Sequence, residues 1–105
     1  MGIAKKGTRT IVVDGERYRW VVAPDDEPGL GIVVEHDEAD GQRMVTWVEH
    51  GTVVAPGLVE VVIRRALERH GWTPRERGRQ LVLRFLGPEL AAGDHWLGAR
   101  GSGTP

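Results

Sequence analysis

Apolar and polar residues alternate in short runs along the first half of the chain, and this two-residue period predicts β-strands. The runs cover residues 8–13, 16–22, 30–36 and 43–50. Turn-forming residues separate them, most clearly Asp14-Gly15 and the stretch DEADGQ at 37–42. The pattern therefore predicts two consecutive β-hairpins.

The first hairpin has the stronger signal. A type I′ turn needs positive φ at both central residues, which Asp-Gly tolerates well. A two-residue turn at Asp14-Gly15 places Val13 opposite Glu16, Ile11 opposite Tyr18, and Arg9 opposite Trp20. One face of this hairpin is then apolar, and we expect it to form the core: Ile11, Val13, Tyr18, Trp20 and Val22.

The second hairpin has a longer connection. With its tip near Ala39-Asp40, the expected pairs are His36 with Arg43, Val34 with Val45, and Ile32 with Trp47. This register extends the core face with the apolar members of those pairs.

An amphipathic helix follows the hairpins. Pro56 suits its first position, and Gly71 suits its end, with Trp72 folding back on the last turn. Its apolar stripe has helical spacing: Val59, Val62, Ile63, Ala66, Leu67 and His70.

A fifth strand is predicted at 81–86, where Leu81, Leu83 and Phe85 alternate with other residues before Gly87-Pro88. The order is β-β-β-β-α-β, which indicates an α+β fold with one helix on one face of an antiparallel sheet. We expect a single domain over residues 1–88 and a partly flexible tail over 89–105, rich in glycine towards its end.

Two stretches resemble a family of small bacterial proteins of unknown function: TIVVDGERYRW at 10–20 and VVAPGLVEVVIRRALERHGWTPRERG at 53–78. The resemblance extends over residues 8–85. The matching positions are Val13, Asp14, Gly15, Tyr18, Trp20, Pro56, Gly71, Trp72, Pro74 and Gly78. Ala55 precedes the helix, at a position where we would expect a hydroxyl cap. The resemblance implies the same fold order and a bacterial origin, but no activity.

Composition limits the classes of function. The chain has 105 residues, no cysteine and a net charge of −1, so it has no disulfide, thiolate metal site or cysteine nucleophile. The N-terminal lysines are not followed by the apolar segment of a signal peptide, and no apolar run could cross a membrane. We therefore expect a cytoplasmic protein. Acidic residues are concentrated at 23–50, and such a dipolar surface could steer a charged partner.

The sequence Val-Glu-His occurs at 34–36 and again at 48–50, which raises the question of a metal or acid/base site. In one antiparallel hairpin His36 lies at the tip and His50 at the open end. They are then about 20 Å apart, too far to share a metal. We interpret the repeat as accidental and His36 as part of a surface turn. The sequence shows no nucleophile arrangement and no phosphate loop, so we expect a non-enzymatic protein without a cofactor.

Protein binding is the leading interpretation. In the expected registers the sheet face opposite the helix is more apolar than a solvated face, so a partner protein, a second copy of the chain or the tail could cover it. An apolar side chain also lies among the exposed arginines of the helix. The candidate contact residues are Val12, Val21, Val33, Met44, Val48 and Val61.

Nucleic-acid binding is the alternative. Arginines gather on the solvent side of the helix and in the following turn, although glutamates lie between them. Guanidinium groups bind phosphate, and binding of this kind weakens with salt. The candidate residues are Arg64, Arg65, Arg69, Arg75, Arg77 and Arg79.

Overall fold

The protein forms a six-stranded sheet and one helix in a computed structural model, which describes residues 8–24, 30–49, 51–85 and 96–99. The strands follow one another in the sheet in chain order: β1 (Arg9–Val13), β2 (Glu16–Pro24), β3 (Leu30–His36), β4 (Met44–Val48), β5 (Leu81–Phe85) and β6 (Trp96–Ala99). The helix, α1 (Pro56–Arg69), lies between β4 and β5 in the chain. The predicted α+β class and the element order up to β5 are confirmed.

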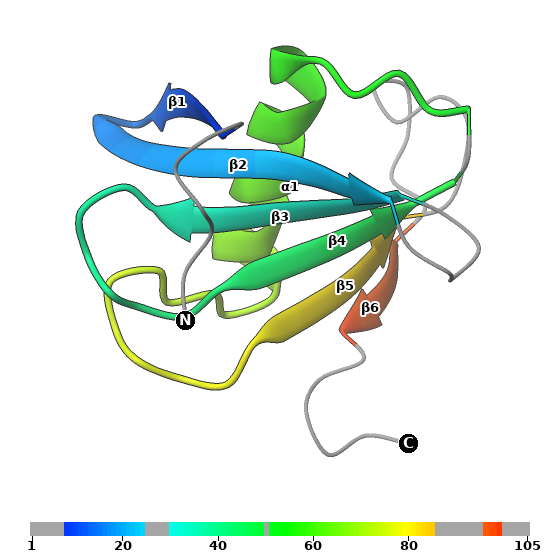
Figure 1. Ribbon diagram of the computed structural model, residues 1–105. Coiled ribbons are helices and arrows are strands. Elements are labelled where there is room, and N and C mark those ends of the chain that lie inside the picture. Colours follow the sequence, from blue (N-terminus) through cyan, green and yellow to red (C-terminus); the bar gives the residue numbers. More distant parts are fainter. Residues whose placement is uncertain (1–7, 25–29, 50, 86–95, 100–105) are drawn as a thin grey trace.

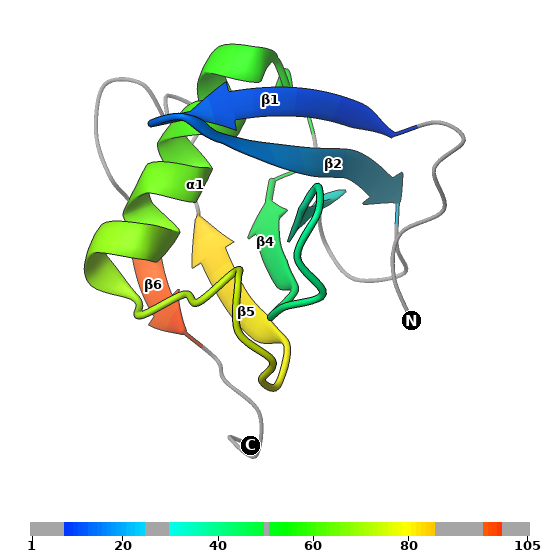
Figure 2. The ribbon, with the colours of Figure 1, turned by 90° about the vertical axis from the view of Figure 1, so that its left-hand side faces the viewer.

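The sheet curls around α1, which lies against one face of it (Figure 1). In the side view β1 and β2 cross the upper part of α1, and β5 and β6 lie beside its lower part (Figure 2). The helix turns its predicted stripe towards the sheet, where Val59, Val62, Ile63 and Ala66 are buried. Ala55 provides no side-chain cap for the helix. The stability of α1 therefore depends mainly on the hydrophobic burial of this stripe.

The β1–β2 hairpin has the predicted register. Val13 pairs with Glu16, Ile11 with Tyr18, and Arg9 with Trp20. Asp14 and Gly15 have φ values of 53° and 82°, as a type I′ turn requires. The predicted core face is confirmed at its centre, where Val13, Tyr18 and Trp20 are buried.

The predicted β3–β4 register is wrong by one residue. Val34 pairs with Met44 and Ile32 with Thr46, so the side chains of β4 exchange faces relative to the prediction. Thr46 lies in the core, where its hydroxyl contacts the sulfur of Met44 at 2.9 Å. Since β4 has apolar residues on both faces, its pattern did not determine which face is buried.

The sheet is mixed rather than wholly antiparallel, because β5 runs parallel to β4. A helix between two neighbouring strands permits this arrangement, since the chain returns to the starting edge before the second strand begins. The predicted tail also contributes to the sheet. Its residues 96–99 form β6, which pairs antiparallel with β5. The boundary that we expected between domain and tail at residue 88 therefore falls between two paired strands of the sheet.

Candidate functional site

A pocket of about 360 Å³ lies between the β1–β2 turn, the end of α1 and the loop that follows α1. Its apolar lining comes from Val13, Tyr18, Leu67 and Pro74. Its polar lining comes from Asp14, Glu16, Thr73, Arg75 and Glu76. Three separate segments of the chain thus meet around one small cavity.

The end of α1 positions one wall of the pocket. Gly71 has a φ of 67°, which turns the chain back so that the amide of Trp72 donates to the carbonyl of Ala66 at 3.1 Å. Trp72 is buried, and its ring centroid lies 5.5 Å from that of Tyr18. The indole N–H donates to the carbonyl of Gln42 at 2.9 Å. Trp72 therefore joins the helix end to both hairpins.

Gln42 holds the loop after α1 against the β3–β4 loop. Its amide nitrogen donates to the carbonyl of Arg79 at 2.7 Å, and its side-chain oxygen accepts from the amide of Thr73 at 2.9 Å. Its backbone N–H donates to the carbonyl of Glu76 at 2.7 Å. The neighbouring Gly41 leaves no room for a side chain, because a Cβ there would collide with the backbone of Pro74. Thr73, Pro74 and Glu76 are consequently held in place.

His36 supports the opposite wall, and its interpretation as part of a surface turn is wrong. It is 3% exposed, and its ring lies edge-on to that of Tyr18 at 5.6 Å. Nδ1 accepts from the backbone amides of Glu38 at 3.0 Å and Ala39 at 2.9 Å. The hydrogen therefore resides on Nε2, which donates to Glu16 Oε1 at 2.7 Å. His50, the other histidine of the repeat, lies outside the described residues.

Glu16 is a carboxylate of the pocket lining that two other side chains hold in place. Its Oε1 accepts from His36 Nε2 at 2.7 Å, from Arg75 Nε at 3.0 Å and from Arg75 Nη2 at 2.8 Å. The hydrogen bond from His36, followed by that from Arg75, lowers the pKa of Glu16, so this group stays ionised at neutral pH. All these contacts converge on one oxygen.

Asp14 lies in the turn and connects the pocket to α1. Both of its carboxylate oxygens accept from Arg64 Nη1, at 3.1 and 3.0 Å. Arg64 also donates through Nε to Glu60 one helical turn earlier, at 3.0 Å. The hydrogen bonds to Glu60 and Asp14 raise the pKa of Arg64. This bridge fixes the tip of the first hairpin relative to the helix.

The pocket brings together residues from the two stretches 10–20 and 53–78, which are far apart in the sequence. Val13, Asp14 and Tyr18 come from the first stretch, and Leu67 and Pro74 from the second. The sequence interpretation did not identify the pocket, nor the roles of Glu16, His36 and Arg75. One sequence signal could have located the pocket: each of the two stretches contains a glycine turn close to aromatic residues, Gly15 near Tyr18 and Gly71 next to Trp72.

The predicted protein-contact residues do not form one exposed surface. Met44 and Val48 are buried in the core at 0% and 1% exposure, so their placement on the face opposite the helix is wrong. The shifted β4 register is the reason. Val61 is partly buried against the core, and Val21 and Val33 are half-buried. Of this set, Val12 alone is largely exposed, at 59%.

The face opposite the helix also carries charge. Glu35 pairs there with Arg19 at 3.2 Å and with Arg43 at 3.3 Å. The indole of Trp47 lies over Gly31, where a Cβ would meet ring carbons at 3.1 and 3.3 Å. This face is therefore a mixture of ion pairs and valines rather than a continuous apolar patch.

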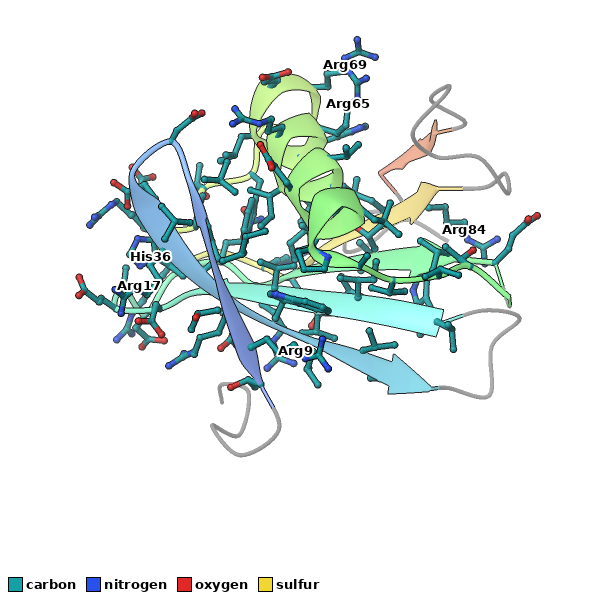
Figure 3. The ribbon with its side chains drawn as sticks, turned by 90° about the horizontal axis from the view of Figure 1, so that it is seen from above. Arg9, Arg17, His36, Arg65, Arg69 and Arg84 are labelled. Carbon is teal, nitrogen blue, oxygen red and sulfur yellow. The ribbon has the colours of Figure 1, made fainter. Side chains whose placement is uncertain are left out.

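The predicted nucleic-acid arginines point in different directions. Arg64 and Arg75 bind carboxylates beside the pocket, and Arg77 lies 3.4 Å from Asp40. Arg65 and Arg69 lie on the other side of α1 from His36 (Figure 3). Arg79 is exposed in the loop after α1. The set does not form a single basic surface, and nucleic-acid binding stays a prediction.

Among the described residues, His, Asp and Glu side chains form no cluster of three that could hold a metal ion. The helix of the described part of the chain is too short and too polar to cross a membrane. Comparison of the chain with protein-family models, with curated proteins and with solved structures gives no match.

Proposed function

We propose that this protein is a small, non-enzymatic binding module that contacts a protein partner through the pocket. The observation that carries this proposal is the combination of an apolar lining with an immobilised polar one. Leu67 is half-buried and offers apolar contact area, and the nearly buried side chains of Val13, Tyr18 and Pro74 complete the apolar lining. Hydrogen bonds hold Glu16 and Thr73 in place. A preformed apolar depression with a few oriented polar groups is typical of a recognition site.

The hydrogen bonds favour binding over catalysis. Both ring nitrogens of His36 are engaged, one by backbone amides and one by Glu16. A general base needs an available lone pair within reach of its substrate, and His36 has committed both positions to the fold. Glu16 is stabilised as an anion, which lowers its basicity.

The test is selection of binding peptides from a random display library with the wild-type protein, followed by counter-screening against two variants. Leu67→Arg places a long charged side chain in the pocket. Leu58→Arg is the matched control, because Leu58 is also a partly buried leucine on α1 but lies at the other end of the helix.

Binding that Leu67→Arg abolishes and Leu58→Arg preserves would support the proposal, provided that thermal melting shows both variants folded. Peptides that bind all three proteins equally would exclude the pocket as the binding surface. Recovery of no binding peptide would count against the proposed function itself.

Self-association is a second candidate, supported by the free edge of β1. In the described part of the chain β1 pairs only with β2. Val13 and Glu16 close the two-residue turn as a hydrogen-bonded pair, so alternation directs the backbone N–H and C=O of Val12 outwards. An exposed edge with an apolar side chain can pair with another strand.

Val12→Lys is expected to convert a dimer into a monomer in sedimentation velocity. A wild-type protein that is monomeric at all concentrations would exclude self-association.

A further inference from the structure

We propose that the pocket receives a lysine side chain from the protein partner, with the ammonium group bound by Glu16. This inference rests on the proposed function and identifies the group that the pocket recognises. It follows from the geometry of Glu16, the sign of the charge around the pocket and the apolar lining.

The contacts of Glu16 with His36 and Arg75 use only one of its two carboxylate oxygens. Its three hydrogen-bond donors, from His36 and Arg75, all meet Oε1 at 2.7 to 3.0 Å. The side chain is 38% exposed and lines the pocket. These contacts restrain the carboxylate at Oε1, and Oε2 accepts from neither His36 nor Arg75, which leaves it as an acceptor on a partly preorganised group. Such preorganisation reduces the entropy cost of binding a donor.

The charge of the pocket lining favours a cation. Asp14, Glu16 and Glu76 contribute −3 and Arg75 contributes +1, which gives −2 in total. Arg64 binds both Asp14 and Glu60, and because its +1 charge is matched by the −1 charge of Glu60, including this pair leaves the total at −2. Oppositely charged groups are attracted to such a site and are oriented as they approach.

The remaining lining suits the hydrocarbon part of a lysine. A lysine side chain is a flexible chain of four methylene groups ending in a compact ammonium ion. Leu67, with the small accessible parts of Tyr18 and Pro74, gives these methylenes an apolar surface, while the head group reaches the carboxylates. The proposed ligand thus matches both parts of the pocket.

The same geometry favours lysine over arginine. A guanidinium group binds a carboxylate most strongly through two parallel hydrogen bonds, one to each oxygen. Oε1 of Glu16 already accepts from His36 and Arg75, so this fork-to-fork arrangement is blocked. A single oriented oxygen suits an ammonium ion, which acts as a point charge.

The test is an NMR titration of the isotope-labelled protein with three capped peptides, Ac-Gly-Gly-Xaa-Gly-Gly-NH2, in which Xaa is lysine, arginine or norleucine. The lysine peptide is expected to shift the backbone amide resonances of Glu16, Leu67 and Thr73. We expect its Kd to be about threefold lower than that of the norleucine peptide, since exposed ion pairs contribute modestly.

Glu16→Gln is expected to remove the preference for lysine over norleucine. Glu68→Gln is the matched control, because Glu68 is an exposed carboxylate of α1 outside the pocket lining and should leave the preference intact. A spectrum with unchanged amide dispersion shows that each variant is folded.

Equal binding of norleucine and lysine, tighter binding of arginine, or the absence of any shift with lysine would each overturn this inference. Equal binding at the pocket would leave the proposed function intact, because the site would still bind an apolar side chain. Failure of the library selection would instead remove the function on which the inference rests.

Discussion

The two hairpins of the sheet are held at their tips by different means. The β1–β2 turn closes through two residues with positive φ, Asp14 and Gly15. The β3–β4 loop is held from outside, because Gln42 and Gly41 pack against the loop that follows α1. The first register is thus determined by adjacent residues, and the second by contacts with a segment about thirty positions later in the chain.

This difference explains why the two loops contribute differently to the pocket. The first turn supplies lining residues directly, through Asp14 and Glu16. The second loop supplies support, since Gln42 positions Thr73 and the backbone of residues 36–39 fixes the ring of His36. Single substitutions in each loop can separate these contributions, and we expect those in the second loop to have the larger effects.

Gly41→Ala is expected to have the largest effect, a loss of about 3 kcal/mol or more in the free energy of unfolding. The new Cβ would collide with the carbonyl of Pro74, which is backbone and cannot move without displacing the loop. Urea unfolding measures the loss. Gly57→Ala is the control, because a Cβ there meets nothing within 4 Å and alanine favours the helix. Equal stability of the two variants would show that the loops are not tightly packed.

Gln42→Ala is expected to reduce the free energy of unfolding by about 2 kcal/mol, because the side-chain hydrogen bonds to the carbonyl of Arg79 and the amide of Thr73 are lost. The side chain donates to Arg79 and accepts from Thr73. Chemical denaturation should show this loss, with Gln80→Ala, at another exposed glutamine site, near wild type. Hydrogen exchange should then be faster at Thr73 but unchanged in β1. Equal acceleration in both regions would mean that the two hairpins are not independent.

Gly15→Ala is expected to cost about 1 kcal/mol, because an alanine at a φ of 82° is strained although no atom obstructs its Cβ. Thermal unfolding measures the change. Gly15→Asn is the comparison, since asparagine tolerates this backbone conformation better than alanine. If Gly15→Ala melts at the wild-type temperature, the turn residues do not determine the register of the β1–β2 hairpin.

Glu16→Gln is expected to have the smallest effect, and that effect depends on pH. The pKa of Glu16 is lowered in the folded protein, so the ionised group stabilises the fold above its ordinary value of 4.5. This stabilisation is lost as the pH falls through the lowered pKa. Melting temperatures of wild type and variant should therefore differ at pH 7 and converge in acid. A difference that is constant with pH would show that the carboxylate charge has no part in it.

The sequence predicted those features that adjacent residues determine. Asp14-Gly15 indicated the first register, Pro56 and Gly71 the ends of α1, and the spacing from Val59 to Ala66 its buried face. The β4 register could not be predicted, because Met44, Val45, Trp47 and Val48 are apolar on both sides of the strand. β6 was missed because a short strand among glycines has little pattern of its own.

The pocket could not be predicted for a similar reason. Its residues come from the first turn, the helix end and the following loop, and hydrogen bonds between these segments create it. His36 illustrates this limit. A histidine at the end of a strand and beside polar residues indicates a surface turn, unless one knows that Tyr18 and Glu16 lie next to it.

The parallel junction between β4 and β5 has a consequence for how the chain folds. The β1–β2 hairpin closes after two residues, whereas β5 can join β4 only after Met44 and Leu81 have been brought together across the whole of α1. Closing the longer segment costs more chain entropy before any contact compensates for it. We therefore expect the first hairpin to form early in refolding and the β4–β5 junction late. Substitutions at Leu83 should then mainly accelerate unfolding, and substitutions at Val13 should slow folding.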